Sequence, residues 1–188
     1  MIDHMKSEDA VLVALLRDGF ERVNISVTDL MEQASPQMLR YRPEANANHI
    51  AWLIWHLSRI QDDHFVHLAR ALWPTQSFEE CWISGGWSGK FKLPYAERET
   101  GYGQTSEQVQ AFGMYDAALL AAYHSAVHQG SNAILGKLQV RNLQTIIDHR
   151  WNPPVSTAVR LVSVLEDTTK HIGQAEYISG LFSAAPHS

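Results

Sequence analysis

The sequence has little cysteine and no membrane-length apolar run. Cys81 is the only cysteine among 188 residues, which excludes an internal disulfide and fits a reducing compartment. The apolar run over residues 50–57 is broken by His56 and followed by Arg59, so it is unsuited to crossing a bilayer. The N-terminus lacks the basic and then apolar layout of a signal peptide. These absences predict a soluble, cytoplasmic protein without a membrane partner.

Positive charge is also scarce. The chain carries 15 lysines and arginines against 20 aspartates and glutamates, a formal net charge of −5 at pH 7. Nothing resembles a basic stripe, so a nucleic-acid partner bound through its phosphates is not expected. Apolar residues make up 45% and charged residues 19%, as in ordinary globular proteins. The length suits a single domain over residues 1–188.

The alternation of apolar and polar residues that marks a sheet is missing, and helical spacing takes its place. Apolar residues recur at steps of three and four, as on one face of an amphipathic helix. This spacing predicts four helices, at about residues 7–33, 46–72, 105–129 and 156–182. Pro36 and Pro74 end the first two, because proline disfavours helical backbone in the residue before it. Asn46 or Asn48 is expected to cap the second helix.

A long connection separates the second and third helices. Residues 74–104 have no helical period and contain several glycines, and the capping box of Thr105 and Gln108 is expected to open the third helix. A connection of this length in a compact domain is either a crossover or a functional loop. The pattern therefore predicts an all-α fold, a four-helix bundle with a long crossover connection between helices 2 and 3.

Asp167 and His171 lie four residues apart on the last helix, so both side chains leave the same face one turn apart. Such a pair can share one metal ion, and His56 on the inward face of the second helix is the candidate third ligand. The set suits a divalent metal, with zinc the leading choice and nickel, cobalt or iron acceptable. It leaves coordination positions open for water or substrate, as catalytic zinc sites do.

A plainer interpretation needs no metal. Asp167 and His171 would then form a buried hydrogen bond, and His56 would be a core histidine bonded to a backbone carbonyl. His49, seven residues before His56, is either a competing ligand or a solvated residue at the helix start. Glu166 points about a third of a turn away from Asp167.

The other histidines and the cysteine receive simpler interpretations. His124 and His128 form a second pair four residues apart, but no carboxylate accompanies them and they are the weaker metal candidate. Most of the ten histidines, including His64 and His67, are expected at the surface. Cys81 has no histidine close by in sequence, so an inert loop cysteine is expected.

Trp52, Trp55 and Arg59 surround His56 in sequence and are candidate substrate contacts. The two tryptophans could line a pocket, although aromatic residues on bundle helices more often belong to the core. Arg59 could neutralise an anionic substrate, but a surface salt bridge is the commoner role of such a residue.

The segments Asn48–Arg59 and Asp167–Ala175 resemble the DinB-like superfamily of metal-binding four-helix bundles, and the order of helices extends this likeness over nearly the whole chain. The resemblance implies that His56, Asp167 and His171 are metal ligands, and that the protein is a homodimer. Many members have histidine where this chain has Asp167. A carboxylate at this position resembles the N-terminal domain of mycothiol-dependent maleylpyruvate isomerase, in which glutamate occupies the same position.

The resemblance also implies chemistry on a small molecule, because characterised relatives include isomerases and S-transferases that use a low-molecular-weight thiol such as mycothiol. Two functions stay open. The first is a metal-dependent thiol transferase or isomerase for a small electrophile, in which the metal holds the thiol as thiolate. The second is a non-catalytic, metal-stabilised, stress-related dimeric module, since no general base is evident in the sequence.

Overall fold

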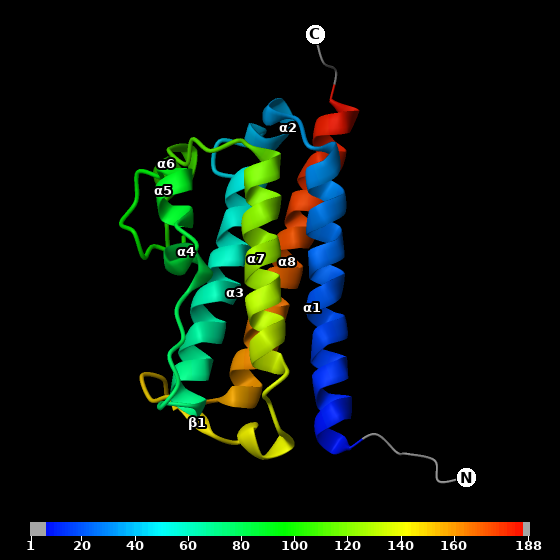
Figure 1. Ribbon diagram of the computed structural model, residues 1–188. Helices are drawn as coiled ribbons and strands as arrows, with labels where there is room; N and C mark the ends of the chain where they lie inside the picture. Colours follow the sequence, from blue (N-terminus) through cyan, green and yellow to red (C-terminus); the bar gives the residue numbers. More distant parts are fainter. Residues whose placement is uncertain (1–6, 186–188) are drawn as a thin grey trace, which may run out of the picture.

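The computed structural model describes residues 7–185. Residues 1–6, which form most of the N-terminal segment considered above for a signal peptide, lie outside this range, as do residues 186–188. Four long helices lie side by side and form the body of the molecule (Figure 1). They are α1 (Glu8–Gln33), α3 (Ile50–Leu72), α7 (Ala117–Leu135) and α8 (Thr157–Ala184). Both α1 and α3 pack against α7 and α8, so the four helices enclose a shared core and the expected helical fold is confirmed.

Local sequence sets most helix ends. Ser156 caps α8 by accepting a hydrogen bond from the Val159 N–H, close to the expected start. Helix α1 ends at Gln33, and the short helix α2 (Pro36–Arg40) starts at the proline that was expected to end α1. Helix α3 ends before Pro74, also as expected.

The N-cap of α3 differs from the expectation. Neither Asn46 nor Asn48 fills this role; His49 does, because its Nδ1 accepts a hydrogen bond from the Trp52 N–H at 3.1 Å. A histidine ring supplies the acceptor that asparagine usually provides. His49 is thereby fixed at the helix start and buried.

The crossover between α3 and α7 contains short helices. Helices α4 (Cys81–Ser84), α5 (Trp87–Phe91) and α6 (Ser106–Gln110) lie together beside α3 (Figure 1). The crossover itself was expected. The prediction that residues 74–104 contain no helix was wrong, because α4 and α5 lie within them. Helices of four and five residues are too short for an apolar period to show in the sequence.

The third long helix starts later than expected. The capping box of Thr105 and Gln108 does form, but it opens only α6. The chain then leaves the helix near Gly113, whose φ is +71°, and Asp116 caps α7 by accepting the Leu119 N–H. Helix α7 continues through Gly130, so the expected range of 105–129 was wrong at both ends.

Two short strands precede α8. Strand β1 (Ile146–Asp148) pairs antiparallel with β2 (Val155–Ser156), with Ile146 opposite Ser156 and Asp148 opposite Val155. No sheet was expected, because strands of three and two residues show no alternation. The hairpin brings Asp148 to the start of α8.

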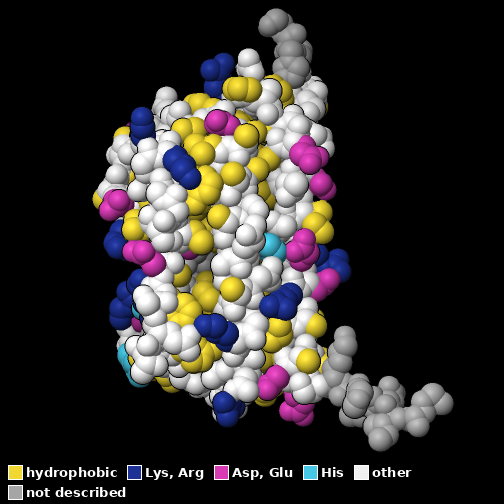
Figure 2. All heavy atoms as spheres, in the orientation of Figure 1, with side chains coloured by type: hydrophobic (Ala, Val, Ile, Leu, Met, Phe, Trp, Pro, Cys, Tyr) yellow, Lys and Arg dark blue, Asp and Glu magenta, His cyan; other side chains and the backbone are white. Residues whose placement is uncertain are grey.

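The surface carries mixed charge. On the face shown in Figure 2, acidic and basic side chains are interspersed along the length of the molecule, with apolar groups between them. Within residues 7–185, no helix is both long and apolar enough to cross a membrane.

Candidate metal centre

Helices α3 and α8 pack directly against each other and bring the three expected ligands together. His56 from α3 and Asp167 and His171 from α8 each offer one ligand atom, and these atoms all lie within 4.8 Å of one another. His56 is 5% exposed, and the other two are half-buried. Residues more than 100 positions apart in sequence therefore form one cluster of a carboxylate and two imidazoles.

His56 is oriented by the crossover. Its Nδ1–H donates to the Thr100 carbonyl at 2.5 Å, which leaves the lone pair of Nε2 free. Burial, with a smaller contribution from the neighbouring His171, lowers the pKa of His56 to about 4, although the hydrogen bond to Thr100 opposes this shift. The ring is therefore neutral at pH 7, as a metal ligand must be.

His171 is oriented within its own helix. Its Nδ1–H donates to Gln174 Oε1 at 3.0 Å, so Nε2 is the nitrogen that lies toward Asp167. The distance from His171 Nε2 to Asp167 Oδ1 is 3.6 Å, which is too long for a hydrogen bond. The plainer interpretation was right about a backbone partner for His56 but wrong about an Asp167–His171 hydrogen bond.

The Asp167 carboxylate is not fully paired within the protein. Its Oδ2 is buried and has no hydrogen-bond partner. Burial raises the pKa of this carboxyl, against the opposing effect of His171 and His64. A cation fits such an oxygen, since buried charges are otherwise paired.

Trp52 forms one wall of the cluster. Its ring stacks on His56 with 4.6 Å between centroids and 14° between planes. The Trp52 and His171 rings are nearly perpendicular, with 6.5 Å between their centroids. Its Nε1 donates to Gln104 Oε1 at 2.9 Å. Trp52 therefore holds the imidazole planes in place, while its contact with a substrate stays a prediction. Trp55 is 1% exposed and belongs to the core.

Gly101 is a site residue that was missed in the sequence. It has a φ of +91°, and a Cβ on it would lie 2.8 Å from His56 Nδ1 and 3.0 Å from the Trp52 and Trp55 rings. Only glycine permits both this backbone conformation and this approach. The sequence shows that the connection contains glycines, but it does not show that Gly101 packs against the His56 ring.

Arg59 is a buried structural residue. Its side chain is fully buried, with Nη2 2.9 Å from Glu80 Oε2 and Nη1 3.6 Å from Asp62 Oδ2. Its Nε donates to the Glu99 carbonyl at 3.1 Å. The surface salt bridge expected for Arg59 is therefore wrong. An anionic substrate could reach the guanidinium only by displacing these partners.

Several other histidines lie deeper than expected. His49 is buried and uses its second nitrogen on the Val109 carbonyl at 3.1 Å, so it is not solvated and has no nitrogen left for a metal. His124 and His128 are also buried, and His64 is half-buried, whereas His67 is exposed as expected. Among residues 7–185, the cluster of potential ligands consists of His56, Asp167 and His171 and does not include the His124–His128 pair.

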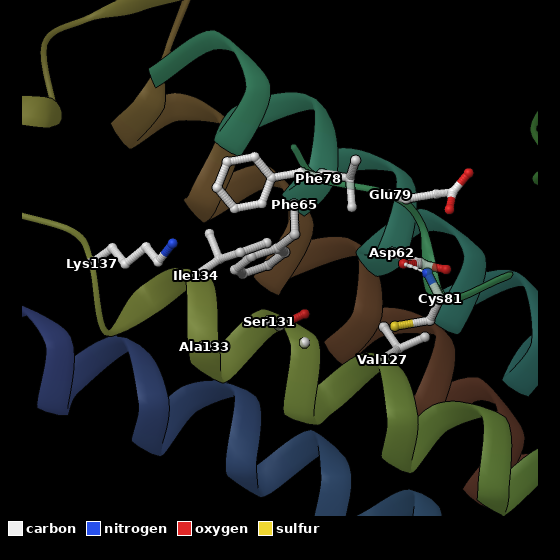
Figure 3. Close-up of a pocket in the computed structure, with 12 residues that line it drawn as sticks. Asp62, Phe65, Phe78, Glu79, Cys81, Val127, Ser131, Ala133, Ile134 and Lys137 are labelled. Carbon is white, nitrogen blue, oxygen red and sulfur yellow. Dashed lines mark hydrogen bonds between the residues drawn. The ribbon is translucent and has the colours of Figure 1, made fainter. Parts of the chain in front are cut away.

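Cys81 lies at a separate cavity of about 170 Å³ between α3 and α7. Figure 3 shows its sulfur directed toward Val127, beside Asp62, whose Oδ1 accepts the Cys81 N–H at 2.9 Å. Burial, together with the charge of Asp62, raises the pKa of the Cys81 thiol to about 11. The thiol is therefore protonated at pH 7, which agrees with the inert cysteine expected from the sequence.

The fold and this cluster define a DinB-like helical protein with a candidate metal centre of one carboxylate and two imidazoles. A family model described as mycothiol-S-transferase matches residues 11–182, and the chain belongs to this family. The crystal structure of a conserved protein from Enterococcus faecalis has a TM-score of 0.81 and 25% sequence identity, over 93% of this chain and 98% of that one. A comparison with curated proteins finds no significant match. The DinB-like assignment is thereby confirmed, and the family suggests a mycothiol-related transferase with small-molecule substrates.

Proposed function

We propose that this protein is a metal-dependent thiol S-transferase, in which His56, Asp167 and His171 bind one divalent ion, most simply zinc. The observation that supports this most is the buried, unpartnered Oδ2 of Asp167 beside the imidazoles of His56 and His171. Bound there, the ion supplies the Lewis acidity that keeps a thiol deprotonated at neutral pH.

The protein's own residues prepare this site. The Thr100 carbonyl and the Gln174 amide oxygen each fix one imidazole so that Nε2 is the nitrogen offered. Trp52 excludes water from one side of His56 by stacking on it. A cavity of about 290 Å³ is lined by Asp167 and Thr100, so a space for a small molecule adjoins the cluster at Asp167.

The reaction needs no covalent nucleophile from the chain. The sulfur of the bound thiol forms a bond to an electrophilic carbon, the thiol proton passes to solvent, and the displaced electron pair leaves with the leaving group. Cys81 does not compete for this role, since its thiol is protonated at pH 7 and lies at another cavity.

The test is the conjugation of mycothiol with monochlorobimane by zinc-loaded protein, followed by fluorescence. We expect turnover above the uncatalysed rate, and a loss of more than about 100-fold in kcat/KM for Asp167→Ala, since even outer partners of ligands contribute 10–100-fold. The exposed His67→Ala on α3 is the matched control and should keep full activity. An absence of turnover with zinc, nickel, cobalt and iron would contradict the proposal and favour a non-catalytic, metal-stabilised module.

A further inference from the structure

The cavity beside Asp167 has a second polar end. Arg150 and Arg160 line it together with Asp167. Arg160 and Asp167 are seven residues apart on α8, so they share a face and lie about 10 Å apart along the helix. The cavity therefore extends from Asp167, one of the three candidate ligands, to these arginines.

Arg160 is a buried cation with an uncommitted donor. It is 9% exposed, and its Nη2 donates to Asp148 Oδ2 at 3.0 Å while Nη1 lies 3.4 Å from His64 Nε2. Its Nε is buried without a hydrogen-bond partner. Arg160 therefore lines the cavity with a guanidinium whose donors are not all paired within the protein.

Asp148 holds both arginines in place. It accepts two hydrogen bonds from the Arg150 guanidinium, at 3.0 Å from Nε and 2.9 Å from Nη2, and a third from the Arg150 backbone N–H, in addition to the one from Arg160. Because each guanidinium has five N–H groups, one shared carboxylate leaves donors on both. The arginines are thus preorganised rather than neutralised.

The cavity is also lined by two carboxylates and a histidine, which are Asp63, Asp167 and His64. Asp63 is 3.3 Å from His64 Nδ1 and partly open to solvent, and Asp167 belongs to the candidate metal centre. His64 is neutral at pH 7 because burial lowers its pKa to about 4. The aromatic rings of Tyr102 and Trp151 line the same cavity and are 81% and 58% exposed, so they offer apolar contact to the body of a ligand.

We propose that this cavity binds a carboxylate of a small reactant that has an apolar body, with Arg160 and Arg150 as hydrogen-bond donors. The inference rests on the proposed function in one respect, since it places the reacting end of that molecule at His56, Asp167 and His171. Under this proposal, at least one of the two reactants carries a carboxylate.

Isothermal titration with benzoate and its neutral analogue benzamide tests this proposal. Both zinc-loaded and metal-free protein are titrated, so the carboxylate site is measured without any need for turnover. We expect benzoate to bind at least about tenfold tighter than benzamide, as a bidentate arginine contact to a charged group warrants. Arg150→Gln and Arg160→Gln should each remove this preference. Arg22→Gln, which changes an exposed arginine paired with Asp18 on α1, should leave it unchanged.

Arg150→Gln is the safer variant, because the Arg150 side chain is 76% exposed and its replacement leaves the packed interior unchanged. Arg160 is buried, so Arg160→Gln is used only after its folding has been checked. Equal binding of benzoate and benzamide, or benzoate affinity that survives in Arg150→Gln and in folded Arg160→Gln, would overturn the proposal. A protein that binds benzoate but takes up no metal would instead contradict the proposed function alone.

The carboxylate can belong to either reactant, and two thiols separate these cases. 3-Mercaptopropionate and 2-mercaptoethanol differ in the carboxylate and share the thiol. Tighter binding of 3-mercaptopropionate to zinc-loaded protein, lost in Arg150→Gln, supports the proposal and assigns the carboxylate to the thiol. Equal binding of the two thiols, together with tight benzoate binding, supports it and assigns the carboxylate to the electrophile.

Discussion

Gly101 holds the crossover against the His56 ring at a distance that a side chain would not allow. A Cβ at this position would lie 2.8 Å from His56 Nδ1, the atom that donates to the Thr100 carbonyl. We therefore expect Gly101→Ala to turn the imidazole and to weaken zinc binding by about 10-fold or more, as the loss of an outer partner does. Competition titration with a chromophoric chelator measures this affinity.

Gly103→Ala is the matched control for Gly101→Ala. Gly103 also has a positive φ, +72°, but a Cβ there meets nothing within 4 Å. Both variants should lose about 1–2 kcal/mol of folding stability through backbone strain. Equal zinc affinities for the two variants would show that the approach of Gly101 to His56 has no role in the site.

The candidate ligands could be predicted from the sequence, but their partners could not. The i, i+4 spacing of Asp167 and His171 places both on one helix face by geometry alone. The bond between His56 and Thr100 spans 44 residues and depends on how the crossover folds back. The same limit explains Arg59, which looked like a surface residue because its partner Glu80 is 21 residues away.

At the scale of elements, Asp62 fastens the crossover to the bundle. Its Oδ1 and Oδ2 accept the N–H groups of Cys81 and Trp82 at 2.9 Å and 2.8 Å, at the start of α4. It also accepts from the Tyr123 hydroxyl on α7 at 3.1 Å, and it lies beside the buried Arg59. One carboxylate on α3 thus joins three segments of the fold.

Replacement of Asp62 should therefore destabilise the protein strongly. We expect Asp62→Ala to cost about 3–5 kcal/mol in the free energy of unfolding, because three donors lose their acceptor and the buried Arg59 keeps only Glu80 as a carboxylate partner. Asp18→Ala removes an exposed carboxylate paired with Arg22 and should cost less than about 1 kcal/mol. Urea unfolding measures the free energy of unfolding of both variants. Similar decreases for the two would mean that Asp62 does not hold the crossover on the bundle.

Element boundaries were predictable where a local signal decides them. Pro36 and Pro74 act on the residues beside them, so the ends of α1 and α3 agreed with expectation. The start of α7 differed from the expectation. The capping box at Thr105 forms, but it starts only the short helix α6, and the chain leaves helical geometry at Gly113. The β1–β2 hairpin is too short to leave any period in the sequence.

At the scale of the whole molecule, buried histidines make stability depend on pH. Burial lowers the pKa of His49 and His56 to about 4 and that of His124 to about 3, against about 6.5 in an unfolded chain. Between these values the unfolded state binds more protons, so stability falls as the pH falls from about 6.5 to about 4. Each histidine contributes a slope of about 1.4 kcal/mol per pH unit.

Thermal unfolding of metal-free protein between pH 8 and pH 4 measures this dependence. The melting temperature should be nearly constant above pH 7 and fall steadily below about pH 6.5. His124→Gln should make the decline shallower, whereas the exposed His67→Gln should leave it unchanged. A melting temperature that stays level from pH 7 to pH 5 would contradict the neutral state assigned to these rings.

The account depends most on the convergence of His56, Asp167 and His171 on one ion, and metal content tests this directly. Protein purified without a nickel column should contain, or take up on titration, about one equivalent of zinc per chain, as a site of preformed ligands requires. His171→Ala and Asp167→Ala should each reduce this to below about 0.1 equivalent under the same conditions. Wild-type protein that takes up no transition metal, or His171→Ala with unchanged content, would contradict the assigned centre.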